Sequence, residues 1–325
     1  MVVTTVAGLL SALAAAHGGE HIQLGPGAYP ALAIEHVSFE RPVTITSADP
    51  RRPAVITGLV IRACSGLSFA GLEFSTAGEK AENPFQVLKS SNIEFARLSV
   101  HGSLNGDPSD DVAAFLIRNS RNVAIKDSEF QQLQDGVGHL DDDGLTIAGD
   151  YFHDMRNDAI RGGGSSHVQI VANRFTDFRP EPRDHDDAIQ FWTTNTTEPA
   201  HDILVKDNVI WRGAGSAAFQ GVFLRDERGS LPFLRVMIDH NLVVGAGYNA
   251  IAISHGQDIA ITDNIVAAFP DNRSWIRWGD VQNLRMTGNR AELYASDLRQ
   301  PTPPGNSTIG PVTDGGRALL AGKVP

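Results

Sequence analysis

One short pattern recurs along this chain, and it constrains the fold more than any other feature. A polar residue is followed by an apolar, a variable and an apolar residue, at 92–95, 122–125, 167–170, 202–205, 258–261 and 283–286. Several copies continue into a small polar turn that ends in asparagine, at Asn173, Asn208, Asn241, Asn264 and Asn289. The spacing of the copies ranges from 22 residues (Ile125 to Ile147) to 35 (Ile170 to Val205). A shortest repeat with occasional longer ones predicts a coiled solenoid that carries loop insertions.

A second set of short segments repeats in step with the first. These quartets are Phe115–Arg118, Asp135–Gly138, Asp158–Arg161, Asp187–Gln190, Gln220–Phe223, Asn249–Ala252 and Ser274–Arg277. The third residue of each is Ile or Val, and we expect it to point inward. Because side chains alternate along a strand, its neighbours should point outward.

Stacking the quartets gives two outward columns of side chains. The first contains Arg161, Gln190, Phe223, Ala252 and Arg277, and the second contains Gly163, Trp192, Arg225, Ser254 and Gly279. The longest insertions, 176–200 and 225–233, flank the middle strands of this face. Insertions in solenoids gather on the binding side, so we expect this face to carry the functional site.

The coil length, the Asn-rich turns and the apolar rhythm resemble the right-handed parallel β-helix superfamily. That superfamily includes pectate, alginate and chondroitin lyases, polygalacturonases, mannuronan C5-epimerases and phage tailspikes. The resemblance implies an all-β chain, a right-handed parallel β-helix over 21–295. Thr4 and Thr5 before an Ala-rich stretch predict an N-terminal capping helix within 1–20, in preference to a signal peptide. Proline-rich residues 296–325 are expected to form a loose C-terminal tail.

Charge and hydropathy limit the partners of the chain. The formal net charge of −11 argues against nucleic acid, because phosphate binding needs a basic surface. A local arginine cluster could still bind an anionic glycan. No uncharged apolar run reaches about 18 residues, so no membrane span is expected. The resemblance implies a secreted or periplasmic protein, although no clear signal peptide is present, and the sequence does not indicate an oligomeric state.

Five consecutive ionisable residues, Arg183 to Asp187, stand at the entrance to one strand of the outward face. The alternative to a catalytic role is a solvated acidic loop. In the functional interpretation His185 is the base, Asp186 or Asp187 orients it, and Asp184 is a candidate Ca²⁺ ligand. His185-Asp186 is similar to part of the Asp-Pro-His-Asp motif of mannuronan epimerases. Asp186-Asp187 is similar to a polygalacturonase pair, but the Gly-His-Gly and Arg-Ile-Lys signatures of those hydrolases are absent.

The outward columns supply candidates for substrate binding. Arg161 is followed by three glycines, and a guanidinium there could grip a sugar carboxylate; Arg183, Arg225 and Arg277 could assist. Gln190 and Trp192 could contact a pyranose ring. Tyr248 is a candidate proton donor. Gln220 and Asn249 are expected to form an internal amide ladder.

These residues favour a polysaccharide lyase that acts on a uronate-containing, alginate-like or pectate-like polymer by β-elimination. A cation neutralises the uronate carboxylate, His185 removes the C5 proton, and an acid protonates the leaving oxygen. A C5-epimerase shares the first of these steps. An inverting hydrolase that uses two of the aspartates is a second alternative, and a non-catalytic, tailspike-like glycan-binding solenoid is a third. No cofactor is certain; Ca²⁺ is the one candidate.

Overall fold

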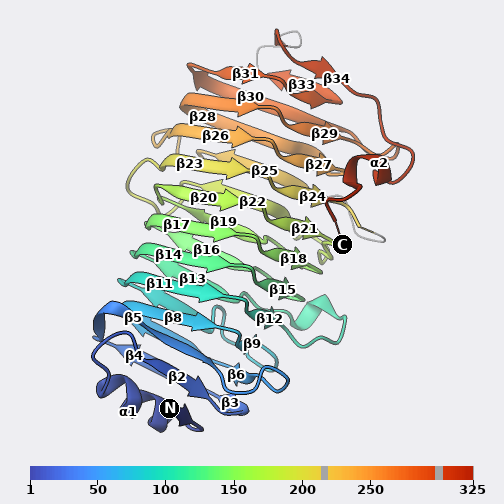
Figure 1. The fold of residues 1–325 in the computed structure, drawn as a ribbon. Helices are drawn as coiled ribbons and strands as arrows, with labels where there is room; N and C mark the ends of the chain where they lie inside the picture. Colours follow the sequence, from blue (N-terminus) through green and yellow to red (C-terminus); the bar gives the residue numbers. More distant parts are fainter. Residues whose placement is uncertain (214–218, 297–302, 325) are drawn as a thin grey trace.

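The computed structural model describes residues 1–213, 219–296 and 303–324, and these form one parallel β-solenoid (Figure 1). Successive coils contribute strands to three rows, and the strands of neighbouring coils pair in parallel throughout the described residues. The predicted all-β parallel fold is confirmed.

The first row bears the site described below. Its strands are β4 (Leu32–Glu35), β7 (Leu59–Arg62), β10 (Phe85–Leu88), β13 (Phe115–Arg118), β16 (Val137–Leu140), β19 (Ile160–Gly163), β22 (Asp187–Trp192), β25 (Gln220–Arg225), β28 (Tyr248–Thr262), β30 (Ser274–Gln282) and β33 (Leu293–Ser296). β28 is long enough to continue into the second row.

The other two rows complete each coil. The second row comprises β1 (Val2–Val3), β2 (His21–Leu24), β5 (Ser38–Ser47), β8 (Ser65–Ala70), β11 (Ser91–Ala96), β14 (Arg121–Lys126), β17 (Asp143–Ala148), β20 (Val168–Val171), β23 (His201–Lys206), β26 (Phe233–Asp239) and β31 (Arg285–Thr287). The third comprises β3 (Gly27–Tyr29), β6 (Ala54–Ile56), β9 (Glu73–Ser75), β12 (Ser99–His101), β15 (Glu129–Gln131), β18 (Tyr151–His153), β21 (Arg174–Thr176), β24 (Val209–Trp211), β27 (Leu242–Val244), β29 (Ile265–Ala267), β32 (Arg290–Ala291) and β34 (Ser307–Thr308).

The predicted stacking of the first row is confirmed, with one shift. Arg161 pairs with Gln190, Gln190 with Phe223, Phe223 with Ala252, and Ala252 with Arg277. The quartet 115–118 is displaced by two residues, because Phe115 pairs with Val137 and Ile117 with His139. A shift of two keeps the alternation of side chains, so both Phe115 and Ile117 still face the core.

The core runs the length of the solenoid and is filled by the inward residue of every strand. Ile160, Ile189, Val222, Ile251 and Ile276 have no exposed surface. Phenylalanine rings stack from coil to coil along the third row, as at Phe130, Phe152 and Phe175. Burial of the inward face alone explains why Ile, Val and Phe recur at alternate positions of these strands.

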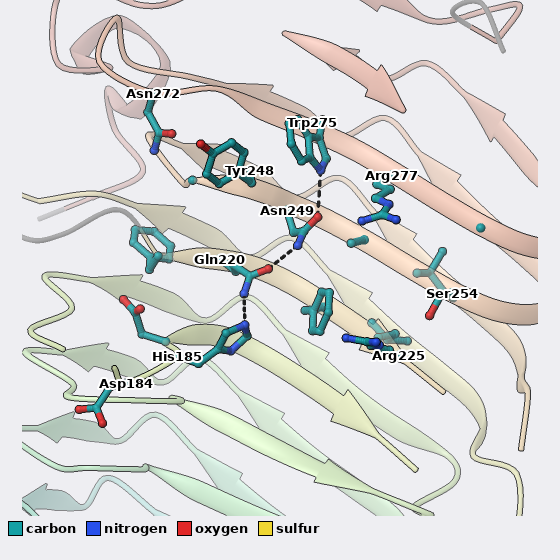
Figure 2. A pocket seen from close by; sticks show the side chains of 18 residues that line it. Asp184, His185, Gln220, Arg225, Tyr248, Asn249, Ser254, Asn272, Trp275 and Arg277 are labelled. Carbon is teal, nitrogen blue, oxygen red and sulfur yellow. Dashed lines mark hydrogen bonds between the residues drawn. The ribbon is translucent and has the colours of Figure 1, made fainter. Parts of the chain in front are cut away.

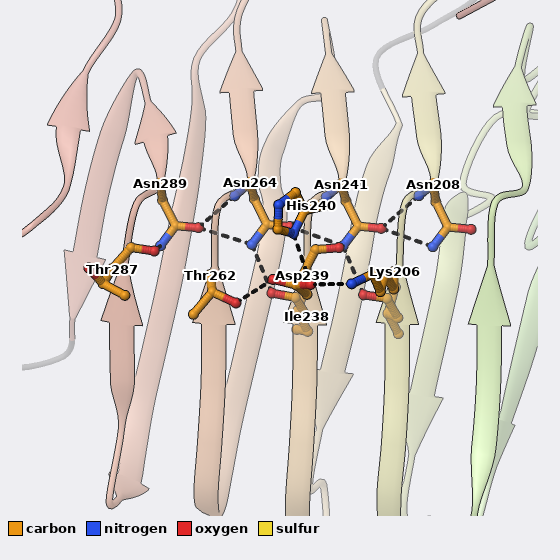
Figure 3. Close-up of polar contacts among 11 residues, drawn as sticks. Lys206, Asn208, Ile238, Asp239, His240, Asn241, Thr262, Asn264, Thr287 and Asn289 are labelled. Carbon is orange, nitrogen blue, oxygen red and sulfur yellow. Dashed lines mark hydrogen bonds and ion pairs between the residues drawn. The ribbon is translucent and has the colours of Figure 1, made fainter.

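An asparagine ladder joins the second row to the third (Figure 3). The side-chain oxygen of Asn241 accepts from the backbone N–H of Asn208 at 3.0 Å and from its side-chain amide at 2.9 Å. Asn264 does the same for Asn241, and Asn289 for Asn264. Each amide also donates to a backbone carbonyl one coil back, as Asn241 does to Val205. The ladder therefore satisfies the buried backbone at each corner.

The two ends of the chain pack on the solenoid. Helix α1 (Val6–Ala14) is capped by the Thr5 hydroxyl, which accepts from the Gly8 N–H at 3.0 Å, and its Leu9 and Leu13 join the core. The C-terminal segment contains more regular structure than its prolines predict. Strand β34 pairs with β32, and helix α2 (Arg317–Leu320) buries Leu320 against β27.

Candidate functional site

An open cleft of about 790 Å³ lies on the first row, over β25, β28 and β30. Of the residues predicted from sequence, the cleft is lined by Asp184, His185, Asp186, Arg225, Tyr248 and Arg277 (Figure 2). Arg161, Arg183, Asp187, Gln190 and Trp192 are not in its lining. The prediction that the functional residues share one face is thus consistent with the cleft, but the structure divides them into a lining set and a supporting set.

His185 projects into the cleft from the loop before β22. Its side chain is 58% exposed, whereas that of Asp187 beneath it is fully buried. The two groups meet through Nδ1 of His185 and Oδ2 of Asp187, 3.1 Å apart. The hydrogen bond to Asp187 raises the pKa of His185 to about 9, against the opposing effect of burial. Asp187 thus holds the ring in place and leaves Nε2 toward the cleft.

Three buried carboxyl groups lie in a column below His185. Asp135, Asp158 and Asp187 precede successive strands of the first row or begin them. The backbone N–H of Asp187 donates to Asp158 at 3.0 Å, and that of Asp158 donates to Asp135 at 3.2 Å. Burial, followed by the charge of Asp187, raises the pKa of Asp158 well above its ordinary value. The column therefore tends to retain a proton next to the histidine.

Arg161 supplies positive charge to this column. Its Nη1 lies 3.1 Å from Asp135 Oδ2 and 3.8 Å from Asp158 Oδ2. The guanidinium carbon also lies 5.5 Å from the ring centre of Trp192. Arg161 was expected to grip a substrate carboxylate, but this structure shows it paired with two protein carboxylates. Trp192 packs on Arg161, and the amide of Gln190 donates to Asp187 at 2.5 Å.

The remaining members of the acidic loop have different surroundings. Asp184, the candidate Ca²⁺ ligand, accepts from Arg156 Nε at 2.8 Å and from Nη2 at 3.4 Å. A cation at Asp184 would have to displace this guanidinium, so calcium binding stays a prediction. Burial raises the pKa of Asp186 to about 6. Arg183 is exposed, with a backbone φ of 88°.

A donor set of the kind that binds metals lies at the base of the cleft. Asp158, His185 and Asp187 each offer one atom, and these atoms lie within 4.8 Å of one another. Asp158 and Asp187 already bond to backbone, side-chain or guanidinium donors.

The opposite side of the cleft is aromatic and cationic. Tyr248 is 59% exposed, and its ring centre lies 5.1 Å from that of Trp275. Tyr248 also has a positive φ of 44°, a strained conformation for a bulky residue. Arg225 on β25 and Arg277 on β30 are exposed, with β28 between their strands (Figure 2). Aromatic rings and guanidinium groups in an open groove suit an anionic sugar chain.

Sequence reasoning missed the buried members of the site. Asp135 and Asp158 occupy the first position of their quartets, as Asp187 does, and Gln220 and Asn249 follow in the same position. This repetition of polar residues was the available signal. The predicted hydrogen bonding between these amides is present, because Asn249 Nδ2 donates to Gln220 Oε1 at 2.5 Å. The ladder is not internal, however, since both side chains are half-buried and line the cleft.

A protein-family model described as the right-handed β-helix region matches residues 85–291, which is more than half of the chain. The fold and its groove define a parallel β-helix protein. The chain belongs to the right-handed β-helix family. A search of curated proteins found no match.

Several solved structures share this fold at low sequence identity. The surface protein and adhesin PfbA of Streptococcus pneumoniae is 13% identical, with 92% of this chain and 94% of that chain covered and a TM-score of 0.58. The GH136 lacto-N-biosidase of Eubacterium ramulus is 12% identical, with 95% and 64% covered and a TM-score of 0.56. A double mutant of the periplasmic alginate epimerase AlgG is 13% identical, with 95% and 77% covered and a TM-score of 0.56. At these identities the likeness establishes the fold alone.

In the described part of the chain, no helix has the length and apolar character needed to cross a membrane.

Proposed function

We propose that this protein removes the C5 proton from uronate residues of an acidic polysaccharide, as a lyase or an epimerase. The observation that supports this most is His185: an exposed imidazole held by a buried carboxylate, in an open cleft that also contains Arg225 and Arg277. Similarity to an alginate epimerase and to a glycoside hydrolase is compatible with a role in polysaccharide metabolism. The periplasmic and surface-protein neighbours favour a location outside the cytoplasm.

In this proposal Arg225 or Arg277 pairs with the sugar carboxylate and makes the C5 proton more acidic. His185 Nε2 accepts that proton, and the electron pair of the C5–H bond moves into the carboxylate as an enolate. In β-elimination the electrons return to form the C4–C5 double bond, and the C4–O bond breaks. The leaving oxygen takes a proton from Tyr248 or water. In epimerisation a proton instead returns to C5 from the opposite face.

The paired-acid hydrolase receives less support from the geometry. The three candidate acids are Asp184, Asp186 and Asp187. Asp187 is buried below His185, and Asp184 lines the cleft but is bonded to Arg156. Asp186 is therefore the one of these three that lines the cleft without an arginine partner. An inverting hydrolase needs two carboxyl groups, one on each side of the sugar, with room for a water molecule between the sugar and one of them.

A matched pair of histidine variants tests the proposal. His240 is 53% exposed and pairs with Asp239 through Nδ1 at 2.9 Å, much as His185 pairs with Asp187, but it lies at the asparagine corner away from the cleft. The protein would be incubated with alginate, pectate and glycosaminoglycans. Ultraviolet absorbance reports unsaturated uronates, and deuterium uptake at C5 reports epimerisation.

We expect the wild type and His240→Gln to act on one of these polymers. His185→Gln should lose on the order of 10²- to 10⁴-fold in kcat, the usual contribution of a general base. Equal activity of the two variants would reject His185 as the base. New reducing ends without absorbance or deuterium uptake would favour a hydrolase, and binding without turnover would favour the adhesin-like alternative.

A further inference from the structure

Three hydrogen bonds connect His185 to an indole across the floor of the cleft (Figure 2). Trp275 Nε1 donates to Asn249 Oδ1 at 2.9 Å. Asn249 Nδ2 donates to Gln220 Oε1 at 2.5 Å, and Gln220 Nε2 lies 2.6 Å from His185 Nε2. The four residues belong to four successive coils, so the line of hydrogen bonds runs parallel to the solenoid axis.

The indole determines the direction of the whole line. An amide can present either its oxygen or its nitrogen, but an indole N–H can only donate. Asn249 must therefore turn its oxygen to Trp275 and its NH₂ to Gln220. Gln220 in turn accepts with its oxygen and presents its own NH₂ to His185. Reversing the line would leave the indole N–H facing an NH₂ group.

This direction specifies which nitrogen of His185 carries the proton. An NH₂ group at 2.6 Å requires an unprotonated Nε2, and the proton then resides on Nδ1, where it is donated to Asp187. Asp187 alone favours the imidazolium form. An imidazolium would place its Nε2–H against the Gln220 NH₂, so the amide line opposes the effect of Asp187.

We propose that Gln220, Asn249 and Trp275 are positioning residues that hold His185 as the Nδ1–H tautomer. The Gln220 NH₂ occupies the Nε2 lone pair and so keeps a proton off this nitrogen. A substrate must displace this amide before Nε2 can take the C5 proton. The tautomer follows from the contacts themselves; its use in catalysis rests on the function proposed above.

Asn249→Asp tests this inference without altering His185 or Gln220. A carboxylate only accepts, so Trp275 can still donate to it, but Gln220 must turn its NH₂ toward residue 249 and its oxygen toward His185. The Nε2 position then favours a proton. Trp275→Phe keeps a ring beside Tyr248 but removes the donor that sets the direction. Asn122→Asp is the control, because Asn122 donates to Asn92 at 3.2 Å in an exposed amide pair.

The readout is the proton-coupled ¹⁵N spectrum of protein labelled at histidine, with the His185 signals assigned by their loss in His185→Gln. The hydrogen bond to Asp187, which raises the pKa of His185 to about 9, would by itself leave both ring nitrogens protonated at neutral pH. We expect the amide line to prevail, with one unprotonated ring nitrogen in the wild type and in Asn122→Asp. Asn249→Asp should show both nitrogens protonated, and Trp275→Phe an intermediate spectrum. Turnover of Asn249→Asp should fall on the order of 10²-fold or more.

Two nitrogens protonated in the wild type, or an unchanged His185 spectrum in Asn249→Asp, would overturn the inference. If the spectra change as expected and no uronate polymer is turned over, the positioning role stands and the proposed function alone fails.

Discussion

Removing one rung from the middle of the asparagine ladder should be among the most destabilising single changes in this protein. In Asn241→Ala the backbone N–H of Asn208 and the carbonyl of Val205 lose hydrogen bonds of 3.0 and 2.9 Å. Asn208 and Asn241 are almost completely buried, so water has no easy access to these groups. An unsatisfied buried group costs about 1–3 kcal/mol, which gives about 2–6 kcal/mol for the pair.

The assay is urea unfolding, monitored with two optical probes. A solenoid can lose its coils in stages, so the two unfolding curves must coincide before a free energy of unfolding is extracted. The slope in urea is about 1–3 kcal/mol per molar for small proteins and grows with size, so about 3–6 kcal/mol per molar is expected here. The midpoint should then fall by roughly 0.3–2 M. Asn306→Ala is the control. Asn306 makes the same contacts to Asn289 but is half-buried, so water can replace them and the cost should be about 1 kcal/mol. Equal losses in the two variants, or a loss below about 1 kcal/mol in Asn241→Ala, would refute this reasoning.

For two further substitutions, the structure determines whether the stability rises or falls. Asp150 precedes Asn173 in the same ladder, its Oδ2 is buried without a partner among the described residues, and burial raises its pKa to about 8. Between about pH 4 and about pH 8 the Asp150 carboxyl keeps its proton in the folded state but loses it in the unfolded state. The free energy of unfolding therefore falls as the pH rises from about 4 to about 8, and the stability present in acid is lost. Asp150→Asn should raise Tm and reduce its fall over that interval; parallel Tm profiles of variant and wild type would contradict this. A Cβ at Gly162 would overlap the carbonyl of His139, whereas at Gly138 it would lie 3.3 Å from the carbonyl of Phe115. Gly162→Ala should therefore cost about 1–3 kcal/mol in thermal or urea unfolding and Gly138→Ala much less, an order that equal stabilities would disprove.

The rows of the solenoid were predictable because one rule covers them. Ile160, Ile189 and Val222 recur at the inward position of each quartet, and strand alternation then places Arg161, Gln190 and Phe223 in one column. The asparagines that end the turns marked the corners equally well. Each of these inferences needs only the period of a strand and a repeating inward residue.

The chemistry of the site depends on side-chain directions that alternation does not determine. Arg161 and Trp192 are correctly placed on the outer face, yet Arg161 bends toward Asp135 and Asp158 rather than toward the cleft. Asp187 begins its strand at a corner, where the chain turns and the simple inward–outward rule fails. Its position beneath His185 depends on the preceding loop, whose path is set by contacts such as that of Arg156 with Asp184.

The asparagine corner also limits where this protein can acquire new loops. From Ala172-Asn173 to Gly288-Asn289, each passage from the second row to the third takes only two residues. The first residue of each passage has a positive φ, and the second is the rung of the ladder. An inserted residue there would break hydrogen bonds in two neighbouring coils. The other corners carry 177–186, 193–200 and 226–232, and these segments adjoin the strands of the cleft. The rigid corner thus leaves the length differences between the coils of this chain to the corners beside the cleft, and engineered loops should be grafted at those same corners.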